Sequence, residues 1–509
     1  MEMIKERHPK GLYVLFGTEM WERFSFYTML AMLVLYMKDV NDGFGMTTAE
    51  ATNVYSWYTA CVYASPLIGG FLADRYLGTR WAITIGAVFF FVGQLMLSAH
   101  NLTFFYCALG LLVLGNGFFK PNISSSVGNL YDEGSRLKDR AYLIFYMGIN
   151  IGAALAPLVA ELIKSNFGYG YAFSTAAFGM MISMVIFWGL KRHIENADRK
   201  PGKLKQSARI PDVEEKKKTE MDLVPAWKRV LALILIFIIV IVFWMIFHQN
   251  GSTLTLWAND HTAWSVTGII SNMINPVFII VLALPLSWFW GKLDKAGLEP
   301  STPAKMAIGM LLTGVSFVVL YFAAVSGNFN APAAKLVSFD APTNSYGVMV
   351  TKETLDAVKS SNEINTIELG TKKVKVIFVD KLLFEDSNAK IGDFGTLKVK
   401  DGKTFVDKTN RVSPLWLILA YLIISLGELM LSPMGLSLVS KVAPVSIRGL
   451  MMGGWFLATA IGNKLTAIGV YWDVWSHSKF FITLAFMAFV VAAILFVLIK
   501  PLKKIMPGA

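Results

Sequence analysis

Long apolar segments alternate with shorter polar ones along this chain of 509 residues. A helix needs about 20 apolar residues to cross the hydrocarbon core of a bilayer, and segments of this length recur throughout. Several are longer, which indicates tilted helices. The pattern predicts twelve membrane-spanning helices, at residues 11–40, 50–73, 80–99, 102–128, 140–164, 169–190, 228–258, 264–291, 304–326, 413–441, 447–471 and 478–500.

Two long polar segments interrupt this pattern. Residues 191–227 form a basic linker that divides the spans into six and six, which suggests two bundles related by an internal repeat. Residues 327–412 contain KKVKVIFVDKLLF, which alternates with a period of two, and place Asp401-Gly402 between two further alternating runs. Alternation around an Asp-Gly pair is typical of strands joined by a hairpin turn.

The predicted fold is therefore an all-α polytopic membrane protein of two six-helix bundles, with a small β-rich domain between helices 9 and 10. That domain is either a passive insertion or a module that captures substrate or a partner, and its deletion would separate the two. The expected boundaries are 1–190 for the first bundle, 191–227 for a cytoplasmic linker, 228–326 for helices 7–9, 327–412 for the extracytoplasmic β-rich domain and 413–509 for helices 10–12.

Basic residues are distributed unevenly between the loops. ADRYLGTR, YDEGSRLKDR, KVAPVSIRG and the linker are rich in Lys and Arg, whereas SAHNLT, KSNFGYG and ANDHTA carry almost none. Since basic loops stay on the cytoplasmic side, both termini are predicted to be cytoplasmic, with the chain in the cell (inner) membrane. This topology explains the net charge of +12 without binding to nucleic acid.

The first span contains three ionisable side chains within five residues, Glu19, Glu22 and Arg23. Their spacing places them on one helix face. A charge near the bilayer centre costs about 2.5–3.5 kcal/mol on insertion scales, and a buried ion pair seldom stabilises a protein more than apolar packing does. The cluster is either an ion pair that locks the first span to a neighbour or a group that binds and releases a proton. We favour the second.

Further polar side chains lie in other spans. Lys120 lies beside Pro121 in span four, where it either lines a cavity or extends towards the cytoplasmic interface. Glu428 stands midway along span ten, and His248 begins a polar step in span seven. Amides and aromatics in the spans, among them Asn150, Asn275, Tyr27, Tyr63 and Trp455, are interhelical contacts or parts of a pocket wall.

These charges predict a dipolar cavity, with positive groups in one half of the chain and Glu428 in the other. Such a cavity suits a zwitterion with separated ends. There is no G-x-x-x-x-G-K-[ST] loop for ATP, and moving one charge through 100 mV yields about 2.3 kcal/mol, so an ion gradient is a sufficient energy source. Titratable Glu19 and Glu22 favour protons over sodium. We expect no cofactor beyond a co-transported proton, and no metal.

The motif EMWERFSFY closely resembles the E-x-x-E-R-F-x-[YF]-Y motif of the proton-dependent oligopeptide transporter family, within the major facilitator superfamily. GGFLADRYLGTRWAITIG is similar to that family's second-span signature. GNGFFKPNISSSVGNLYD, FYMGINIGA, NPVFII, LGELMLSPMGLS and GGWFLATA resemble its spans four, five, eight, ten and eleven. The resemblance implies the major facilitator fold, alternating access and the import of di- and tripeptides together with protons.

The resemblance also implies roles for individual positions. The cluster in the first span would couple transport to protons, linked to Lys120, which would also attract the peptide carboxylate. Glu428, with Asn275, would hold the peptide amino group. The other substrate contacts that it implies are Tyr27, Tyr63, Asn150, Trp455 and Thr459.

Two positions depart from the family pattern. Leu30 stands where the family usually has an Arg, and FHQNG replaces a stretch of span seven in which many members have an acid. In the family those two groups can pair as an outer gate. Both charges are absent here, so neither is left without its partner. We hypothesise that His248, next to Gln249, takes over part of the titration, because imidazole titrates near neutral pH.

Two other functions stay open. The closer one is a carrier of the same superfamily for another small solute, such as nitrate, an amino acid or a related metabolite. The other is a membrane receptor that uses the β-rich domain, which would predict an uncharged bundle interior. An enzyme is not expected, because the sequence has no H-E-x-x-H or G-x-S-x-G motif. The expected partners are peptide, protons and the lipid bilayer, with the protein acting as a monomer.

Overall fold

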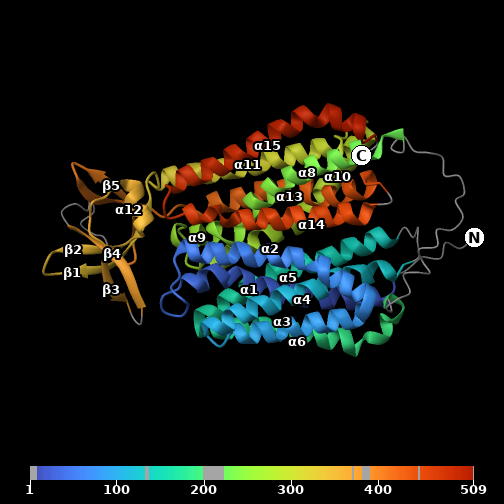
Figure 1. The fold of residues 1–509 in the computed structure, drawn as a ribbon, viewed down its shortest axis with the longest axis horizontal. Helices are drawn as coiled ribbons and strands as arrows, with labels where there is room; N and C mark the ends of the chain where they lie inside the picture. The colour runs from blue at the N-terminus through green and yellow to red at the C-terminus, as the bar shows by residue number, and fades with distance from the viewer. Residues whose placement is uncertain are drawn as a thin grey trace, which may run out of the picture.

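Long helices run side by side along the longest axis of the molecule, and a small sheet projects from one end of them (Figure 1). The computed structural model describes residues 8–131, 137–198, 223–369, 372–380, 390–444 and 447–507. We call the end of the helices that carries the sheet the sheet end, and the opposite end, where α1 begins and α15 ends, the terminal end.

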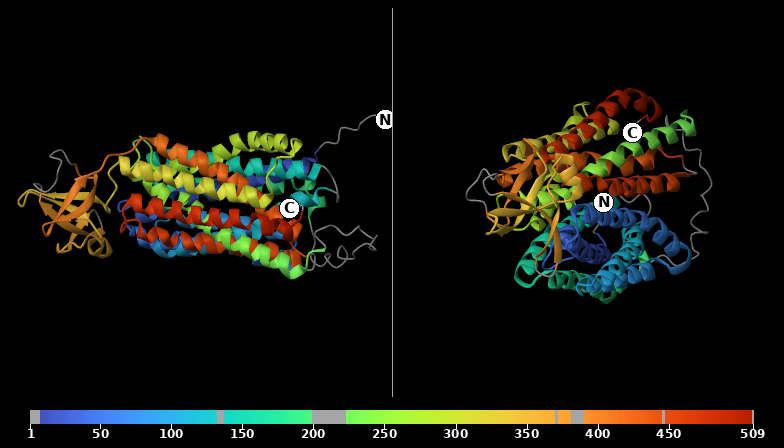
Figure 2. Two further views of the ribbon diagram at one scale, coloured as in Figure 1. Left: turned by 90° about the horizontal axis from the view of Figure 1, so that it is seen from above. Right: turned by 60° about the vertical axis from the view of Figure 1, so that its left-hand side comes forward.

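The helices form two groups, which lie beside each other in Figure 1 and in the right-hand view of Figure 2. The N-half consists of α1 (Lys10–Lys38), α2 (Thr48–Leu72), α3 (Thr79–Leu97), α4 (Leu102–Asn129), α5 (Leu137–Phe167) and α6 (Tyr169–Gly189). The C-half consists of α8 (Ala226–Phe247), α9 (Thr253–Asp260), α10 (Ile274–Lys295), α11 (Thr302–Ser326), α13 (Pro414–Val442), α14 (Arg448–Leu465) and α15 (His477–Ile505). Within the halves, α1 packs on α5 and α6, and α11 packs on α13 and α15.

A helix lies at each of the twelve predicted positions, but span seven is not continuous. A 3-10 turn, η5 (His248–Gly251), separates α8 from α9, so the uninterrupted helix predicted over 228–258 is wrong at this point. Gln249 in the turn bonds to other elements, since its Nε2 donates to the carbonyl of Thr466 at 3.2 Å and its Oε1 accepts from Thr253 Oγ1 at 2.8 Å. Two further 3-10 segments, η6 (Gly268–Met273) and η9 (Thr466–Tyr471), precede α10 and follow α14.

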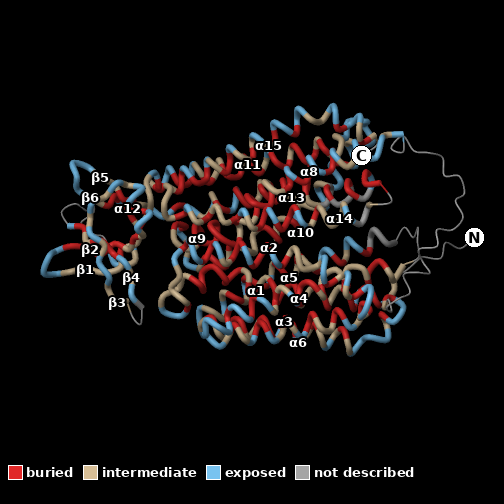
Figure 3. Tube along the Cα trace, viewed as in Figure 1, coloured by how far each residue is buried: buried red, intermediate tan, exposed pale blue. Residues whose placement is uncertain are grey.

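In the described part of the chain, nine helical segments are long and apolar enough to cross a membrane. α1, α2 and α14 fall outside this set, and in α1 the charges of Glu22 and Arg23 lower the mean hydropathy. Buried residues follow the faces where helices meet, while the outer faces are exposed (Figure 3). Some of these faces carry large apolar side chains, such as Leu284 at 78% exposure and Val497 at 77%. Such a surface matches lipid rather than water.

Side-chain caps fix where several helices begin. Thr47 precedes α2 and accepts from the backbone N–H of Glu50 at 3.2 Å, while the Glu50 carboxylate accepts from the N–H of Thr47 at 2.8 Å. Asn101 precedes α4, and its side-chain oxygen accepts from the backbone N–H groups of Thr103 and Phe104 at 3.0 and 3.1 Å. These bonds satisfy donors that the first turn of a helix leaves unpaired, so the short connections define where each helix starts.

The sheet contains six antiparallel strands in the order β3-β4-β2-β1-β5-β6. They are β1 (Ala333–Asp340), β2 (Ser345–Met349), β3 (Asn365–Leu369), β4 (Lys372–Asp380), β5 (Phe394–Lys400) and β6 (Lys403–Lys408), with a short helix, α12 (Lys352–Val358), after β2. The predicted hairpin is confirmed, because Lys400 pairs with Lys403 and the turn residues Asp401 and Gly402 have φ angles of 51° and 75°. Positive φ at both positions is what a type I′ turn requires. The predicted strand at 372–384 is confirmed over β4, and its remainder lies outside the described residues.

Candidate functional site

A buried ion pair lies on α1. Arg23 Nε donates to Glu22 Oε2 at 2.5 Å, and its Nη2 donates to Oε1 at 2.6 Å, so the two groups meet through two parallel bonds. Nη2 also donates to Asn116 Oδ1 on α4 at 3.4 Å, and the Asn116 amide donates to the carbonyl of Val62 on α2 at 2.8 Å. The pair therefore connects three helices of the N-half.

Glu19 lies beside this pair and is only 1% exposed. Its Oε1 is 3.2 Å from Arg23 Nε, which is close enough for an ion pair. Neither carboxylate oxygen makes a hydrogen bond with any described residue, since Arg23 directs its N–H groups at Glu22. Glu19 is therefore a buried acid held by charge alone.

Lys120 on α4 faces the same cluster. It interacts electrostatically with both acids, and its Nζ lies 4.9 Å from the centre of the Tyr63 ring on α2. A cation this close to an aromatic face is attracted by the ring quadrupole. The structure thus brings together the four predicted coupling residues of the N-half.

Glu428 on α13 is the acid of the C-half. Asn275 on α10 donates to Glu428 Oε2 at 2.9 Å and to Ser425 Oγ at 2.9 Å, so the amide holds the carboxylate in place. Glu428 also interacts electrostatically with Tyr27 and Tyr63 of the N-half. Tyr63 therefore lies beside Lys120 of its own half and within electrostatic range of Glu428 in the C-half.

His248 reaches the same tyrosine from η5. Its ring centre lies 5.6 Å from that of Tyr63 and 5.1 Å from that of Trp244, against which it stacks at 25°. Its Nε2 is buried and has no hydrogen-bond partner among the described residues. The ring is thus positioned beside the charged groups, and one of its nitrogens bonds to no described residue.

The remaining predicted contacts make local bonds. Asn150 donates to the carbonyl of Tyr146 at 2.9 Å, and Thr459 donates to that of Trp455 at 3.1 Å. Trp455 packs edge-on against Phe237 at 6.4 Å, within the C-half. The structure places these three side chains on α5 and α14, and their described bonds do not join them to the charged cluster.

Asn116 and Ser425 were not singled out by the sequence analysis. Each supports a predicted residue, since Asn116 binds Arg23 and Ser425 shares the Asn275 amide with Glu428. Helical spacing is the signal that could have found them. Asn116 precedes Lys120 by four positions and Ser425 precedes Glu428 by three, so each lies on the same face as a predicted charge.

The two positions that depart from the family pattern carry no unsatisfied charge. The Gln249 amide is fully buried and donates to the carbonyls of Met245 and Thr466, both in the C-half. Leu30 packs against the apolar core. The pair of neutral side chains is therefore accommodated without a buried unpaired ion.

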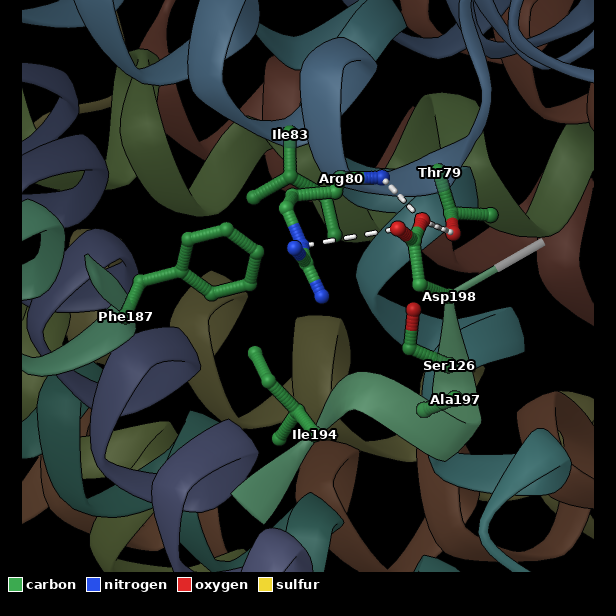
Figure 4. A pocket seen from close by; sticks show the side chains of 8 residues that line it. All are labelled: Thr79, Arg80, Ile83, Ser126, Phe187, Ile194, Ala197 and Asp198. Atoms are coloured by element: carbon green, nitrogen blue, oxygen red, sulfur yellow. Dashed lines mark hydrogen bonds and ion pairs between the residues drawn. The ribbon is translucent and has the colours of Figure 1, made fainter. Parts of the chain in front are cut away.

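A separate pocket lies in the N-half, where α3 begins (Figure 4). Asp198, which follows α6, accepts from Thr79 Oγ1 and from the N–H of Arg80, both at 3.1 Å, and lies 3.4 Å from Arg80 Nε. Because Asp198 caps α3 from outside that helix, it attaches the start of the linker to the GGFLADRYLGTR segment. The predicted transport residues do not line this pocket.

The sequence profile of the POT family (PTR2) matches residues 80–219, 203–375 and 394–481. The chain belongs to the POT family. Among POT relatives it is 29% identical to YclF, an uncharacterized transporter from Bacillus subtilis (strain 168), over 98% of this chain and 96% of the relative. It is 28% identical to a di-/tripeptide transporter from Lactococcus lactis subsp. lactis (strain IL1403), over the same shares.

Solved POT structures are also similar. A crystal structure of peptide transporter POT in complex with sulfate superimposes with a TM-score of 0.74 at 28% identity, over 98% of this chain and 96% of that one. A POT family transporter in complex with a thioalcohol conjugated peptide gives 0.73 at 25% identity, over 97% of each chain. The protein is therefore a multi-pass helical membrane transporter of the POT fold, with a small sheet at one end.

Proposed function

We propose that this POT-family chain imports di- and tripeptides together with protons by alternating access. The observation that carries the proposal is the meeting of opposite charges from the two halves around the same tyrosines. Lys120 Nζ lies 4.9 Å from the centre of the Tyr63 ring, and Glu428 lies within electrostatic range of Tyr63 and Tyr27. A peptide has a positive amino end and a negative carboxyl end, so it can bind Glu428 in one half and Lys120 in the other at the same time. A free anion has only one of these charges and cannot connect the halves in this way.

The peptide binds in one orientation. Its amino group pairs with Glu428, whose position Asn275 and Ser425 fix. Its carboxylate pairs with Lys120, beside Tyr63. Tyr27, Asn150, Trp455 and Thr459 complete the substrate contacts, as the family resemblance implies. Tyr27 and Asn150 contact the peptide backbone, while Trp455 and its neighbours shape the pocket for the peptide side chains.

Proton coupling takes place at the acids of α1. Glu19 can accept a proton without breaking a hydrogen bond to a described residue, whereas Glu22 would have to give up two bonds to Arg23. Protonation of Glu19 removes one negative charge beside Arg23 and Lys120, which leaves these cations freer to attract the peptide carboxylate. The driving force is about 2.3 kcal/mol for each charge that moves through 100 mV.

His248 supplies a second titrating group. Its ring contacts Trp244 and Tyr63, and its buried Nε2 bonds to no described residue, so it can take up a proton when the site opens to water. A His248→Gln variant is expected to alter the pH dependence of uptake while still binding peptide. Wild-type pH dependence in that variant would remove His248 from the mechanism.

For the arrangement in the membrane, we propose that all twelve helices span it in the major facilitator arrangement of two six-helix bundles. The proposed divisions are 1–190, 191–227, 228–326, 327–412 and 413–509. The uneven distribution of Lys and Arg supports cytoplasmic termini, an extracytoplasmic sheet and residence in the inner membrane. The transporting unit is a monomer, because both charged groups come from one chain.

Competition tests the substrate class. Purified protein in liposomes is supplied with labelled dialanine under an inward proton gradient, and unlabelled dialanine, nitrate or free alanine is added in excess. Only unlabelled peptide is expected to suppress uptake. Suppression by nitrate or alanine alone would favour a carrier of another small solute, and the absence of uptake would remove the proposed function.

A further inference from the structure

Two seams join the N-half to the C-half. In the first, α2 packs against α14 and η9, and in the second, α5 packs against η6 and α10. Both seams reach the sheet end, because α2 begins there, α5 and α14 end there, and η6 and η9 lie next to those helix ends.

Lys464 on α14 crosses the first seam. Its Nζ donates to Asn53 Oδ1 at 2.9 Å and to Ser56 Oγ at 3.1 Å, both on α2. The same ammonium lies 4.5 Å from the centre of the Trp57 ring, also on α2. Three groups of the N-half therefore hold one charge of the C-half.

Glu161 on α5 crosses the second seam with the opposite charge. Its carboxylate accepts from the N–H of Thr267 at 3.0 Å and from the Thr267 hydroxyl. Thr267 immediately precedes η6 in the C-half, so the acid holds the residue that begins that turn. Ser165, one turn further along α5, donates to the same carboxylate at 3.1 Å.

At the terminal end, the described side-chain bonds stay within one half of the molecule. His8 bonds to Tyr131 and Asp198 to Arg80 within the N-half, while Lys305 bonds to Glu299 within the C-half. Among the described residues, the polar side chains that bond across the halves lie towards the sheet end. The charged bonds between the halves are thus concentrated on one side of the proposed substrate site.

We propose that Lys464 and Glu161 are positioning residues that hold the sheet end of the transporter closed, one on each seam. This inference rests on the proposed function, because it assigns the bonds to one state of the alternating-access cycle. Opening the sheet end separates each charge from its partners and returns it to water. Exchanging these bonds for hydrogen bonds to water changes the free energy only slightly. The bonds therefore favour the state in which the sheet end is closed, and they can still break in every transport cycle.

Distances between spin labels test the proposal directly. Cys61 and Cys107 are free and exposed, so both are replaced by Ser. Labels are then attached through Ala49→Cys, at the exposed start of α2, and Ser265→Cys, in the exposed connection before η6. Their distance distribution in nanodiscs, without substrate, reports how far the halves are apart at the sheet end.

In the labelled protein, Lys464→Met and Glu161→Gln are each expected to raise the ratio of long to short distances at least about threefold. Lys464→Arg should restore the short distance, because Arg can also donate to Asn53 and Ser56. The matched control is Lys479→Met, since Lys479 stacks on Trp475 at 5.0 Å within the C-half. If Lys464→Met does not fold, Asn53→Ala combined with Ser56→Ala removes the same bonds from the other half.

Unchanged distances in Lys464→Met and Glu161→Gln would overturn the proposal, as would an equal change in Lys479→Met. Because the measurement uses no peptide, such a result leaves the proposed transport function intact. Failure of the unmodified protein to take up dialanine would instead remove the proposed transport function. The label distances would still show whether Lys464 and Glu161 hold the sheet end closed.

Discussion

At the scale of single residues, helical spacing predicted that Glu19, Glu22 and Arg23 lie together but not which acid binds the base. Glu19 and Arg23, four positions apart, are the pair that helix geometry favours. The structure instead gives two hydrogen bonds of Arg23 to the adjacent Glu22, while Glu19 keeps an ion pair with Arg23 at 3.2 Å. The position of a flexible side chain depends on neighbours from other helices, here Asn116, and these are not adjacent in sequence.

Glu428 carries the first prediction. Replacing it with Gln removes the charge that pairs with the peptide amino group but keeps a side chain of similar shape for Asn275. Hydrogen bonds to charged groups contribute about 1.5–3 kcal/mol, and 1.4 kcal/mol is a factor of ten in affinity. Dialanine is therefore expected to compete for uptake at least about tenfold less well, whereas N-acetylated dialanine changes little. Equal losses for the two ligands would contradict the role of Glu428.

At the scale of helices and strands, apolar length and turn chemistry predicted most of the elements. The Asp401-Gly402 pair predicted the β5–β6 hairpin, because the tight turn needs positive φ at two successive residues and few residue pairs adopt that conformation. α12 was not predicted, since seven residues are too few to show a hydrophobic period. The break at η5 was missed because it depends on the bonds of Gln249 to Thr466, which is distant in sequence.

Close packing of α2 on α4 gives the second prediction. A Cβ added at Gly69 would stand 2.0 Å from the carbonyl oxygen of Gly117, so the two helices must separate to accept it. Overpacking of this kind costs about 1–3 kcal/mol. Gly69→Ala should lower the midpoint of thermal unfolding in detergent. Gly110→Ala is the control on α4, because its Cβ would meet nothing within 4 Å. A Gly69→Ala protein as stable as the control would show that this contact is not tight.

At the scale of the whole molecule, the sequence indicated two halves and a sheet but not how the sheet is attached. The attachment is built on His261, which follows α9. Its ring lies 4.4 Å from Phe329, 4.8 Å from Phe394 at the start of β5 and 4.7 Å from His477. The backbone N–H of Val412 donates to the His261 carbonyl at 2.9 Å. His261 and His477 are 216 positions apart along the chain, a separation that no local pattern could connect.

Acid pH is predicted to weaken this junction. Burial lowers the pKa of His261 well below its usual value, and the charges of Lys38 and Arg411 lower it further. Below a pH of about 6.5 the unfolded chain binds a proton that the folded protein does not, so stability falls as the pH falls. The loss grows steadily as the pH falls further below about 6.5.

Thermal unfolding at pH 7.5 and pH 5 checks this prediction, with His261→Phe as the matched variant, since Phe keeps the ring contacts and cannot titrate. The difference in unfolding midpoint between the two pH values should be smaller in His261→Phe than in the unmodified protein. The same difference in both proteins would show that His261 does not titrate on unfolding.

In the proposed mechanism, the acids and bases of the two halves act together on one peptide and one proton. Dialanine uptake into liposomes, driven by an inward proton gradient, tests it in the unmodified protein, Glu22→Gln, Lys120→Ala and the exposed control Lys292→Ala. We expect Glu22→Gln and Lys120→Ala to lose gradient-driven accumulation and Lys292→Ala to retain it. Full accumulation by both Glu22→Gln and Lys120→Ala would contradict the proposed mechanism.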